Sequence, residues 1–489
     1  MKWNSKGGLR LRVSRCIFRS RWLLLFTILL WLGGCSDEPH LCAAEMTLCG
    51  DRCVDLTSSV EDCGDCGHSC VADDGLVGLC VDGNCISECE DSSHTFCDGG
   101  CTDVLSDNDN CGSCENRCRP TDRCVEGKCE IRPFVVENID AISAEGGTLR
   151  HRVAMVLDDE ERLHVTFVER FSDDPERLIY AIRHNDESWT MEVVTEAEDQ
   201  LAPRIGIVVD SRGDPAISLY DEQIFIATRD ILKTGWRLEP VTDVETDDEA
   251  WWTPNALAIR SDDSLCMAFG GLDNRVRYAE EFEDGWTFEI LEDGPTLGSF
   301  GIQVDDADRA HLLYTAEFET GMLGTRLMYT HQNGQGWEME EIDHLGPIYE
   351  LHLALDDEGG PHIVFEDTTT WVLYYGRRDE SGWYTTPIVA DEGWSWGDTP
   401  PSEDEFPSIA IDAEGVPHIA YYSHHEKLRY ARKVDGKWDI VTVHRGPGGW
   451  DNLRYTWPTL ALDSQGIPHI VFRSHDQRQL GYATMVVED

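Results

Sequence analysis

A histidine recurs in one apolar frame along the chain, in "GGPHIVFED", "EGVPHIAYY" and "QGIPHIVFR" (residues 359–367, 414–422 and 465–473). An imidazole can act as a general base or bind a metal ion near neutral pH. An active site needs a catalytic histidine at one place, whereas this histidine occurs in most of the repeated units of the chain. We therefore expect it to satisfy polar groups between neighbouring strands, not to do chemistry. The recurring residues are His164, His311, His362, His418 and His469.

Cysteine is the second residue type whose spacing suggests chemistry, because 16 of the 19 cysteines lie between Cys42 and Cys129. They form two successive sets of eight with similar spacings. A segment this rich in cysteine in an exported chain is held by disulfides, because it buries too little apolar surface otherwise. The CxxC pairs at 63–66 and 111–114 also fit zinc, but an oxidising compartment favours bridges over thiolates. We expect full pairing without a metal, in a connectivity that the sequence leaves open.

The frame "CGDRCVDLTSSVEDCGDCGHSC" with "CVDGNC" is echoed by "CDGGCTDVLSDNDNCGSCENRC" with "CVEGKC". It resembles the stigma-specific protein family of cysteine-rich modules. The resemblance implies two secreted, disulfide-held modules and little about a ligand. Within the second module, Asp107, Asn108, Asp109 and Asn110 could cup a calcium ion. They lack the full loop of ligands that such a site needs, so we predict a solvated turn.

The first 34 residues carry seven basic residues and no acid, and include the apolar run "WLLLFTILLWL" at 22–32. This is a signal peptide whose apolar run is too short to span a bilayer comfortably. The "LGGC" ending at Cys35 resembles the lipobox of bacterial lipoproteins, which implies lipidation of Cys35 and a stable membrane anchor. In that family Asp after the cysteine favours the inner membrane. Ser36 stands there, so we expect an outer-membrane or cell-surface location. Plain secretion or an uncleaved anchor is the alternative.

The chain is strongly acidic, with 93 Asp and Glu against 40 Lys and Arg and a formal net charge of −53. Removal of the seven basic residues of the signal would leave a net charge of about −60. A surface of this charge repels nucleic acid and anionic lipid, so we expect neither as a partner. Membrane association would depend on the lipid anchor alone.

From about residue 133 the cysteines stop and seven units follow at intervals of about 45 to 57 residues. Each contains short alternating stretches that read as four strands, which is typical of propeller blades. The seven anchoring stretches are "VLDDEERLHVTF", "VVDSRGDPAISLY", "AIRSDDSLCMAF", "QVDDADRAHLLY", "ALDDEGGPHIVF", "AIDAEGVPHIAY" and "ALDSQGIPHIVF". The sequence therefore predicts an all-β protein: a seven-bladed β-propeller preceded by two small disulfide-rich modules.

Other residues recur with the blades and are expected to be structural. An Asp opens most first turns and can bond the backbone two residues on, while Gly213, Gly359, Gly415 and Gly466 can take positive φ there. In the third unit Arg260 replaces the Asp, and Ala216 and Cys266 take the histidine's place in the second and third units. Third-strand tyrosines and fourth-strand tryptophans would pack between blades. They are Tyr180, Tyr278, Tyr329, Tyr375, Tyr430 and Tyr482, with Trp189, Trp236, Trp286, Trp337, Trp383 and Trp438.

The seventh unit lacks a fourth strand headed by tryptophan. The segment "RPFVVENID" at 132–140 alternates like a strand and precedes the first unit. We expect it to pair beside Tyr482 and join the two ends of the array, which removes an open sheet edge.

Seven tryptophans fit neither the signal nor the repeat. They fall in or beside loops of one rim, where a second strand leads to a third or one blade leads to the next. Indole faces beside carboxylates suit the C–H faces and hydroxyls of sugars, and suit a cationic or peptide ligand nearly as well. Plugging of the central channel or loop packing is the structural alternative. With one neighbouring tyrosine, the predicted ligand-binding residues are Trp251, Trp252, Trp371, Trp394, Trp396, Trp450, Tyr455 and Trp457.

The array resembles sialidase-like propellers with Asp-box repeats, because D-x-x-G precedes an apolar strand in several blades. That resemblance implies a glycoside hydrolase or lyase in the same cavity as the alternative function. The SxDxGxTW box and the F/Y-R-I-P motif are absent, so no catalytic residue can be assigned. No phosphate loop, Ser-His-Asp signature or HExxH helix occurs, and we expect no cofactor.

The sequence thus favours a lipid-anchored surface protein that binds a polysaccharide or a cell-surface protein; a propeller that only docks partners is a third possibility. The predicted domains are a signal peptide (1–34), a tether (35–41), two cysteine-rich modules (42–87 and 88–130) and the propeller (131–489).

Overall fold

The computed structural model describes most residues from position 42 onward. The described ranges are 42–43, 46–70, 79–86, 89, 94–97, 100–139, 148–170, 175–197, 205–221, 223–229, 235–241, 255–270, 275–283, 285–292, 300–317, 325–344, 347–367, 369, 372–388, 407–423, 427–445, 458–473 and 480–486. Across these ranges no helix is long and apolar enough to cross a membrane. The chain divides into two compact units, Met1–Glu88 with Asp98–Gly100 and Cys89–Cys97 with Cys101–Asp489. The predicted signal peptide and the predicted lipidation site Cys35 lie outside the described residues.

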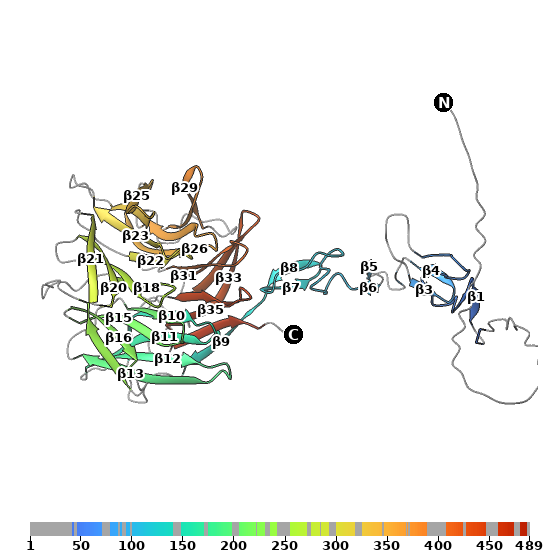
Figure 1. Ribbon diagram of the computed structural model, residues 1–489, viewed down its shortest axis with the longest axis horizontal. Coiled ribbons are helices and arrows are strands. Elements are labelled where there is room, and N and C mark those ends of the chain that lie inside the picture. Colours follow the sequence, from blue (N-terminus) through green and yellow to red (C-terminus); the bar gives the residue numbers. More distant parts are fainter. Residues whose placement is uncertain are drawn as a thin grey trace, which may run out of the picture. The chain divides into compact units, whose positions relative to one another are not determined.

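The cysteine-rich segment is built from short antiparallel strand pairs (Figure 1). Its strands are β1 (Thr47–Cys49), β2 (Arg52–Val54), β3 (Leu79–Val81), β4 (Asn84–Ile86), β5 (Thr95–Cys97), β6 (Gly100–Thr102), β7 (Asp122–Val125) and β8 (Lys128–Ile131). Such two-stranded sheets are too small to be stable alone, so covalent bridges supply what a hydrophobic core would.

Each set of eight cysteines pairs completely within itself. The described residues contain eight disulfides, and the order of pairing is the same in both sets: first with third, second with fifth, fourth with seventh, sixth with eighth. The bridges are Cys42–Cys53, Cys49–Cys66, Cys63–Cys80 and Cys70–Cys85, then Cys89–Cys101, Cys97–Cys114, Cys111–Cys124 and Cys118–Cys129. Complete pairing confirms the prediction from the cysteine count, and the structure supplies the connectivity.

Both sets also bring two glycines into close backbone contact. A Cβ on Gly64 would lie 2.4 Å from the carbonyl oxygen of Gly83, and one on Gly112 would lie 2.5 Å from that of Gly127. Gly64 and Gly112 have φ of +73° and +76°. Only glycine readily adopts the left-handed backbone conformation and also has no Cβ to clash with the facing carbonyl oxygen.

The first set allows these two requirements to be tested separately. Gly67 has φ of +77°, but a Cβ added there would meet no atom within 4 Å. We expect Gly67→Ala to cost about 1 kcal/mol for the strained backbone alone. Gly64→Ala should prevent native pairing of Cys63 with Cys80, because backbone cannot move aside. Disulfide mapping by mass spectrometry after oxidative refolding checks this; equal native pairing in the two variants would contradict it.

Within the described residues from 134 onward, seven four-stranded antiparallel sheets surround a common centre and form blades 1 to 7 (Figure 1). The first strands are β10 (Thr148–Leu157), β14 (Gly206–Val209), β18 (Asn255–Ile259), β22 (Phe300–Val304), β26 (Ile348–Leu355), β30 (Ser408–Ile411) and β34 (Thr459–Leu462). Each contacts the next, and β10 contacts β34, so the inner ring is closed.

The remaining strands follow outward in chain order. The second strands are β11 (Leu163–Arg170), β15 (Pro215–Asp221), β19 (Leu265–Gly270), β23 (Ala310–Glu317), β27 (Pro361–Asp367), β31 (Pro417–Ser423) and β35 (Pro468–Arg473). The third strands are β12 (Glu176–Arg183), β16 (Gln223–Arg229), β20 (Val276–Phe282), β24 (Thr325–Gln332), β28 (Val372–Asp379), β32 (Lys427–Val434) and β36 (Leu480–Met485). The fourth strands are β13 (Trp189–Ala197), β17 (Trp236–Pro240), β21 (Gly285–Glu292), β25 (Trp337–Ile342), β29 (Gly382–Pro387), β33 (Lys437–Arg445) and, in blade 7, β9 (Phe134–Ile139).

Closure of the ring occurs as the sequence predicts. Strand β9 pairs antiparallel with β36, with Glu137 opposite Tyr482 and Ile139 opposite Leu480. The first segment after the cysteines therefore completes the last blade. Ile139 is 1% exposed and packs with residues of blades 1 and 7.

The recurring tyrosines and tryptophans join neighbouring blades at five of the seven seams. The ring of Tyr180 in blade 1 packs edge-on against Trp236 in blade 2 at 5.2 Å, and Tyr329 packs in the same way against Trp383 at 5.1 Å. In blade 7 the partner of Tyr482 is Trp189 of blade 1, at 6.1 Å. These contacts confirm the predicted packing role, which follows from the preference of aromatic pairs for edge-to-face geometry.

Candidate functional site

The two edges of the propeller differ in composition. At the edge called here the 1–2 rim, a first strand turns into a second and a third into a fourth. At the opposite edge, the 2–3 rim, a second strand leads to a third and a fourth leads to the next blade. The recurring aspartates lie at the 1–2 rim, and the recurring histidines lie on the second strands close to it.

Four of the recurring histidines, His164, His311, His362 and His418, are buried with both ring nitrogens in contact with a polar partner. His362 is 3% exposed; its Nε2 lies 3.2 Å from Asp356 Oδ2 and its Nδ1 lies 2.7 Å from the hydroxyl of Tyr375. Burial lowers the pKa of His362 and raises that of Tyr375. A neutral imidazole thus donates to the carboxylate and accepts from the phenol. The same Asp–His–Tyr chain occurs as 158–164–180, 305–311–329 and 412–418–430. In blade 7, His469 Nδ1 bonds the hydroxyl of Tyr482 at 2.6 Å, but its Nε2 lies 3.6 Å from Asp463 Oδ2 and makes no hydrogen bond.

The aspartate of each chain also shapes its turn. The Oδ1 of Asp412 accepts from the amides of Glu414 and Val416, while its Oδ2 faces His418 at 3.1 Å. Gly415 in that turn has φ of +75°. One carboxylate therefore ties the turn to the sheet. These contacts confirm the predicted structural role of the histidines and the predicted turn chemistry.

Blade 3 replaces this chain by a different one. Arg260 Nη2 donates to the hydroxyl of Tyr278 at 2.6 Å and pairs with Glu280. Cys266 stands in the histidine's place and is fully buried, so burial raises its pKa to about 11. A thiol with this pKa is inert near neutral pH, which leaves Cys266 as a small core residue.

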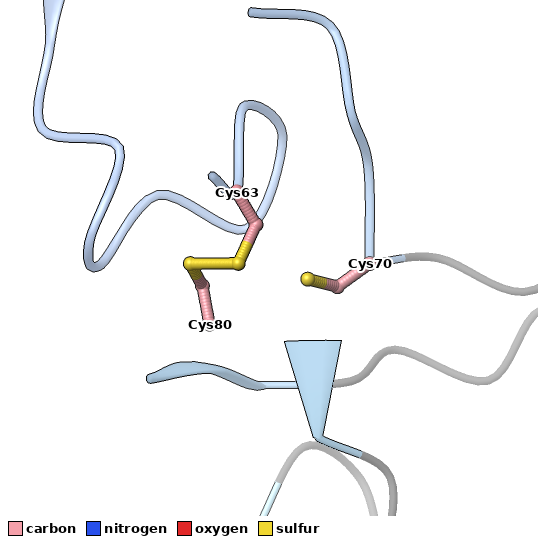
Figure 2. A group of neighbouring side chains, drawn as sticks. All are labelled: Cys63, Cys70 and Cys80. Atoms are coloured by element: carbon pink, nitrogen blue, oxygen red, sulfur yellow. A yellow bond between two sulfur atoms is a disulfide. The ribbon is translucent and has the colours of Figure 1, made fainter. Parts of the chain in front are cut away.

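The clustered cysteines are not metal ligands. The sulfurs of Cys63, Cys70 and Cys80 lie within 4.8 Å of one another, but Cys63 is bonded to Cys80 (Figure 2). Cys70 is bonded to Cys85. The corresponding group in the second set is bonded likewise. Both CxxC pairs consist of half-cystines, so they offer no thiolate.

The acidic stretch at 107–110 forms a turn, as predicted. Asp107 Oδ1 accepts from the amides of Asp109 and Asn110, both at 2.9 Å. Asn108 Oδ1 accepts from the amide of Cys124 at 2.7 Å. Asp109 pairs with Arg117 at 2.7 Å. These oxygens are committed to the fold of the module.

The eight predicted ligand-binding aromatic residues all lie outside the described residues. Four described pairs of strand ends flank them: β17 and β18 around Trp251 and Trp252, β27 and β28 around Trp371, β29 and β30 around Trp394 and Trp396, and β33 and β34 around Trp450, Tyr455 and Trp457. Each of these strand ends belongs to the 2–3 rim. The role of the eight residues stays a prediction.

The described residues of the 2–3 rim depart from the repeat in a way that the sequence reasoning missed. Four places after the histidine position, near the end of each second strand, the residue differs in nearly every blade. The seven residues are Val168, Tyr220, Gly270, Thr315, Glu366, Tyr422 and Arg473. Burial of a charged group costs free energy unless it is paired, so a wheel built only for stability would keep apolar residues here. An alignment of the second strands would have revealed these positions, because Glu366 and Arg473 place a charge near the end of an otherwise apolar strand.

Arg473 lies at the seam of blades 7 and 1. It is 4% exposed, and its Nη1 donates to the carbonyl of Leu149 in β10 at 3.0 Å. Burial lowers the pKa of Arg473 to about 10. Tyr422 of blade 6 donates its hydroxyl to the carbonyl of Arg473 at 3.0 Å. These contacts link blades 6, 7 and 1 at this rim.

The acids of the same rim gather in blades 1 and 5. Glu169 and Glu176 of blade 1 are 3% and 4% exposed, and Glu350 and Glu366 of blade 5 are 4% and 0% exposed. Each stands within two residues of a strand end, or at a strand end, facing the 2–3 rim. The rim thus combines buried carboxylates with one buried guanidinium.

A histidine and an aspartate meet at the seam of blades 4 and 5. His344 Nε2 lies 3.1 Å from Asp367 Oδ2, and the His344 ring packs edge-on against Phe365 and Tyr374 at 4.8 and 5.2 Å. Asp367 also accepts from the amide of Thr369 at 2.7 Å. His444 occupies a similar place in blade 6, with its ring 5.4 Å from Phe472 of blade 7. Because two blades share this packing, His344 is primarily a rim core residue.

Comparison with known proteins supports the fold and one family resemblance. Residues 79–132 match the Stigma-specific STIG1-like protein family, which confirms the predicted resemblance over that range. No curated protein matches the chain by sequence.

Solved structures resemble the propeller at low identity. An ulvan lyase of polysaccharide lyase family PL25 is 11% identical, with a TM-score of 0.50 over 71% of this chain and 96% of its own. The NanB sialidase of Streptococcus pneumoniae is 10% identical (TM-score 0.38; 73% of this chain and 71% of that chain). AofleA of Arthrobotrys oligospora is also 10% identical (TM-score 0.40; 70% and 84%). At these identities the likeness concerns the fold alone.

Proposed function

We propose that this protein is a surface-anchored lipoprotein whose 2–3 rim binds a polysaccharide. The proposal is based mainly on one observation: at this rim, the residues at equivalent positions differ from blade to blade. Residues that recur build the wheel, and those at this rim that do not recur are the candidates for contact with a ligand.

Two features support a carbohydrate ligand. The buried charged residues Glu350, Glu366 and Arg473 lie at the strand ends of this rim, next to the segments that carry the predicted binding residues. In the sequence, the segments between the flanking strand ends contribute the unassigned tryptophans, whose faces stack on sugar rings. The ulvan lyase with this fold acts, as its name says, on a polysaccharide, which is consistent with the proposal.

Anchoring is part of the same proposal. The "LGGC" motif supports lipidation of Cys35, with Ser36 favouring the outer membrane or cell surface. The disulfides of the following segment suit an oxidising compartment outside the cytoplasm.

Replacement of Trp394, Trp396 and Trp450 by Ala tests the rim. We expect the triple variant to lose at least about tenfold in retention on a polysaccharide array, because each lost stacking contact weakens binding by a sizeable fraction of 1.4 kcal/mol. Its melting temperature should stay nearly unchanged. Tyr384→Ala is the matched control, because Tyr384 is an aromatic residue 57% exposed on the outer strand β29.

Retention that is unchanged in the triple variant would refute the assignment. Release of new reducing ends or unsaturated sugars from a retained polysaccharide would instead indicate a glycoside hydrolase or lyase at this rim. Binding of a cell-surface protein without any glycan would favour a protein ligand.

A further inference from the structure

We propose that the second cysteine-rich module is a dedicated docking partner of blade 6, held on the 1–2 rim by Arg432, and that it clamps the closure of the propeller. The module and the propeller belong to the same compact unit. The inference rests on contacts between residues more than 300 positions apart and does not depend on the identity of any ligand.

Arg432 makes the central contact. It is 2% exposed in β32, and its two terminal nitrogens reach the module: Nη1 donates to Thr121 Oγ1 at 2.7 Å, and Nη2 lies 2.7 Å from Asp122 Oδ1. Nη2 also lies 3.5 Å from Oδ2 of Asp439, a half-exposed residue of β33 in the same blade. Thr121 and Asp122 are each 4% exposed. A buried ion pair of this kind is costly unless both partners are present and correctly placed. The contact is therefore specific for this pair of surfaces.

A second ion pair connects the module to the blade's own framework. Arg119 Nη1 lies 3.6 Å from Asp412 Oδ2, the same oxygen that faces His418. Arg432 stands opposite His418 in the register of β31 and β32. The docking surface is thus the turn and third strand of blade 6, at the 1–2 rim.

The docking segment of the module is held in one conformation. The amide of Asp122 donates to the carbonyl of Arg119, and the amide of Arg132 donates to that of Thr121, both at 2.9 Å. The side chain of Arg132 donates to the carbonyls of Pro120 and Asp122 at 3.1 and 3.0 Å. Disulfides flank the segment through Cys118 and Cys124. Little conformational entropy remains to be lost when such a segment docks.

Among the described residues, the contact is specific to the second module and blade 6. The second module has five residues, "RPTDR", between its sixth and seventh cysteines, where the first module has nine, "VADDGLVGL". On the propeller side, the residue two places after the third-strand tyrosine position is arginine only in blades 5 and 6, and the arginine of blade 5 is exposed. The residues at this position are Ile182, Thr228, Glu280, His331, Arg377, Arg432 and Thr484 in blades 1 to 7. The segment that distinguishes the second module from the first thus contacts the buried arginine that distinguishes blade 6 from the other blades. We infer that these two features belong together.

Docking also bears on closure of the ring. Ile131 and Phe134, which connect the module to β9, pack on the core shared by blades 6 and 7, and the Phe134 ring lies 5.2 Å from Tyr430. The module therefore fixes the start of the closing strand. Because β9 begins at the 1–2 rim, the chain leaves the propeller toward its N-terminus on the side opposite the 2–3 rim proposed to bind ligand.

Hydrogen exchange of the full mature chain tests the clamp. In Arg432→Met, which keeps the apolar stem, we expect amides of residues 119–132 to exchange about 100-fold faster or more, because a buried Asp loses its partner. Arg377→Met is the matched control: Arg377 holds the same register position in blade 5 but is exposed. It should leave exchange in 119–132 unchanged.

Unchanged exchange of 119–132 in Arg432→Met would overturn the proposal. If that variant loses protection throughout the propeller, Asp122→Asn and Thr121→Val decide the question from the module side. Faster amide exchange confined to residues 119–139 in these two variants would support the proposed clamp. Unchanged exchange in both variants would contradict it. Glycan retention is measured separately, so failure of the ligand proposal would leave this result intact.

Discussion

Replacing Ile139 by Asp is expected to unfold the propeller, while Val135→Asp on the same strand is tolerated. Ile139 is 1% exposed in the core shared by blades 7 and 1, whereas Val135 is 52% exposed. A carboxylate at position 139 must be desolvated or must expel β9 from the sheet. Either outcome lowers the free energy of unfolding by about 4 kcal/mol or more.

The loss of β9 would have a second consequence. Strand β36 would present an unpaired edge, and an open edge promotes association between chains. We therefore expect Ile139→Asp to elute as aggregates in size-exclusion chromatography and to lack a cooperative urea transition in tryptophan fluorescence. A variant that stays monomeric with an unchanged transition would show that β9 does not close the ring.

Acidification is expected to destabilise the propeller steeply, with the first loss between pH 7 and 5. Burial lowers the pKa of His164, His311 and His362 in the folded state below the value of about 6.5 that holds in the unfolded chain. His418 shifts in the same direction for the same reason. Below about pH 6.5 the unfolded chain thus binds more protons than the folded one, so the free energy of unfolding falls as the pH falls.

The aspartates of the same chains act at lower pH. Burial raises the pKa of Asp305, but hydrogen bonds from Arg309 and His311 outweigh it and lower the pKa to about 2. Asp158 shifts downward through His164 and Arg162 despite its burial. Their stabilising contribution is present above about pH 4 and is lost as the pH falls further.

Urea titrations at a series of pH values measure this effect. They are best done in 1 M NaCl, where the Debye length of about 3 Å screens the self-repulsion of the acidic surface. We expect the free energy of unfolding to fall continuously between pH 7 and 5, because the four buried histidines all have lowered pKa values and their effects act in the same direction. The double variant His311→Gln with His362→Gln should be less stable at pH 7 and lose stability less steeply. An identical slope in that variant would assign the pH dependence to other groups.

Much of the fold could be predicted because the information lies in short, repeated patterns. The interval between the Pro-His-Ile stretches and their counterparts gives seven blades, and the even sets of cysteines give complete pairing. The orphan strand at 132–140 gives closure, because a seventh blade without a fourth strand must find one. The turns could be predicted from residues such as Asp412 and Gly415, because the conformation of a tight turn depends mainly on residues that are close in sequence.

The candidate site was less accessible to the same reasoning. The sequence drew attention to aromatic residues in the loops, but not to the buried charges at the strand ends, such as Glu366 and Arg473. Periodicity predicts which side of a strand is buried, and does not say which seam between blades a buried charge faces. That depends on how neighbouring sheets pack.

The sequence by itself determined the number of blades, the closing strand, the complete pairing of the cysteines and the structural use of the recurring histidines. Only the tertiary structure decided which cysteines pair, that each histidine links a turn aspartate to a third-strand tyrosine, and that Arg432 receives Thr121 and Asp122. The physical reason is the sequence separation of the residues that interact. Local and periodic interactions leave a pattern along the chain, whereas a single contact between residues 311 positions apart leaves none until both surfaces are folded.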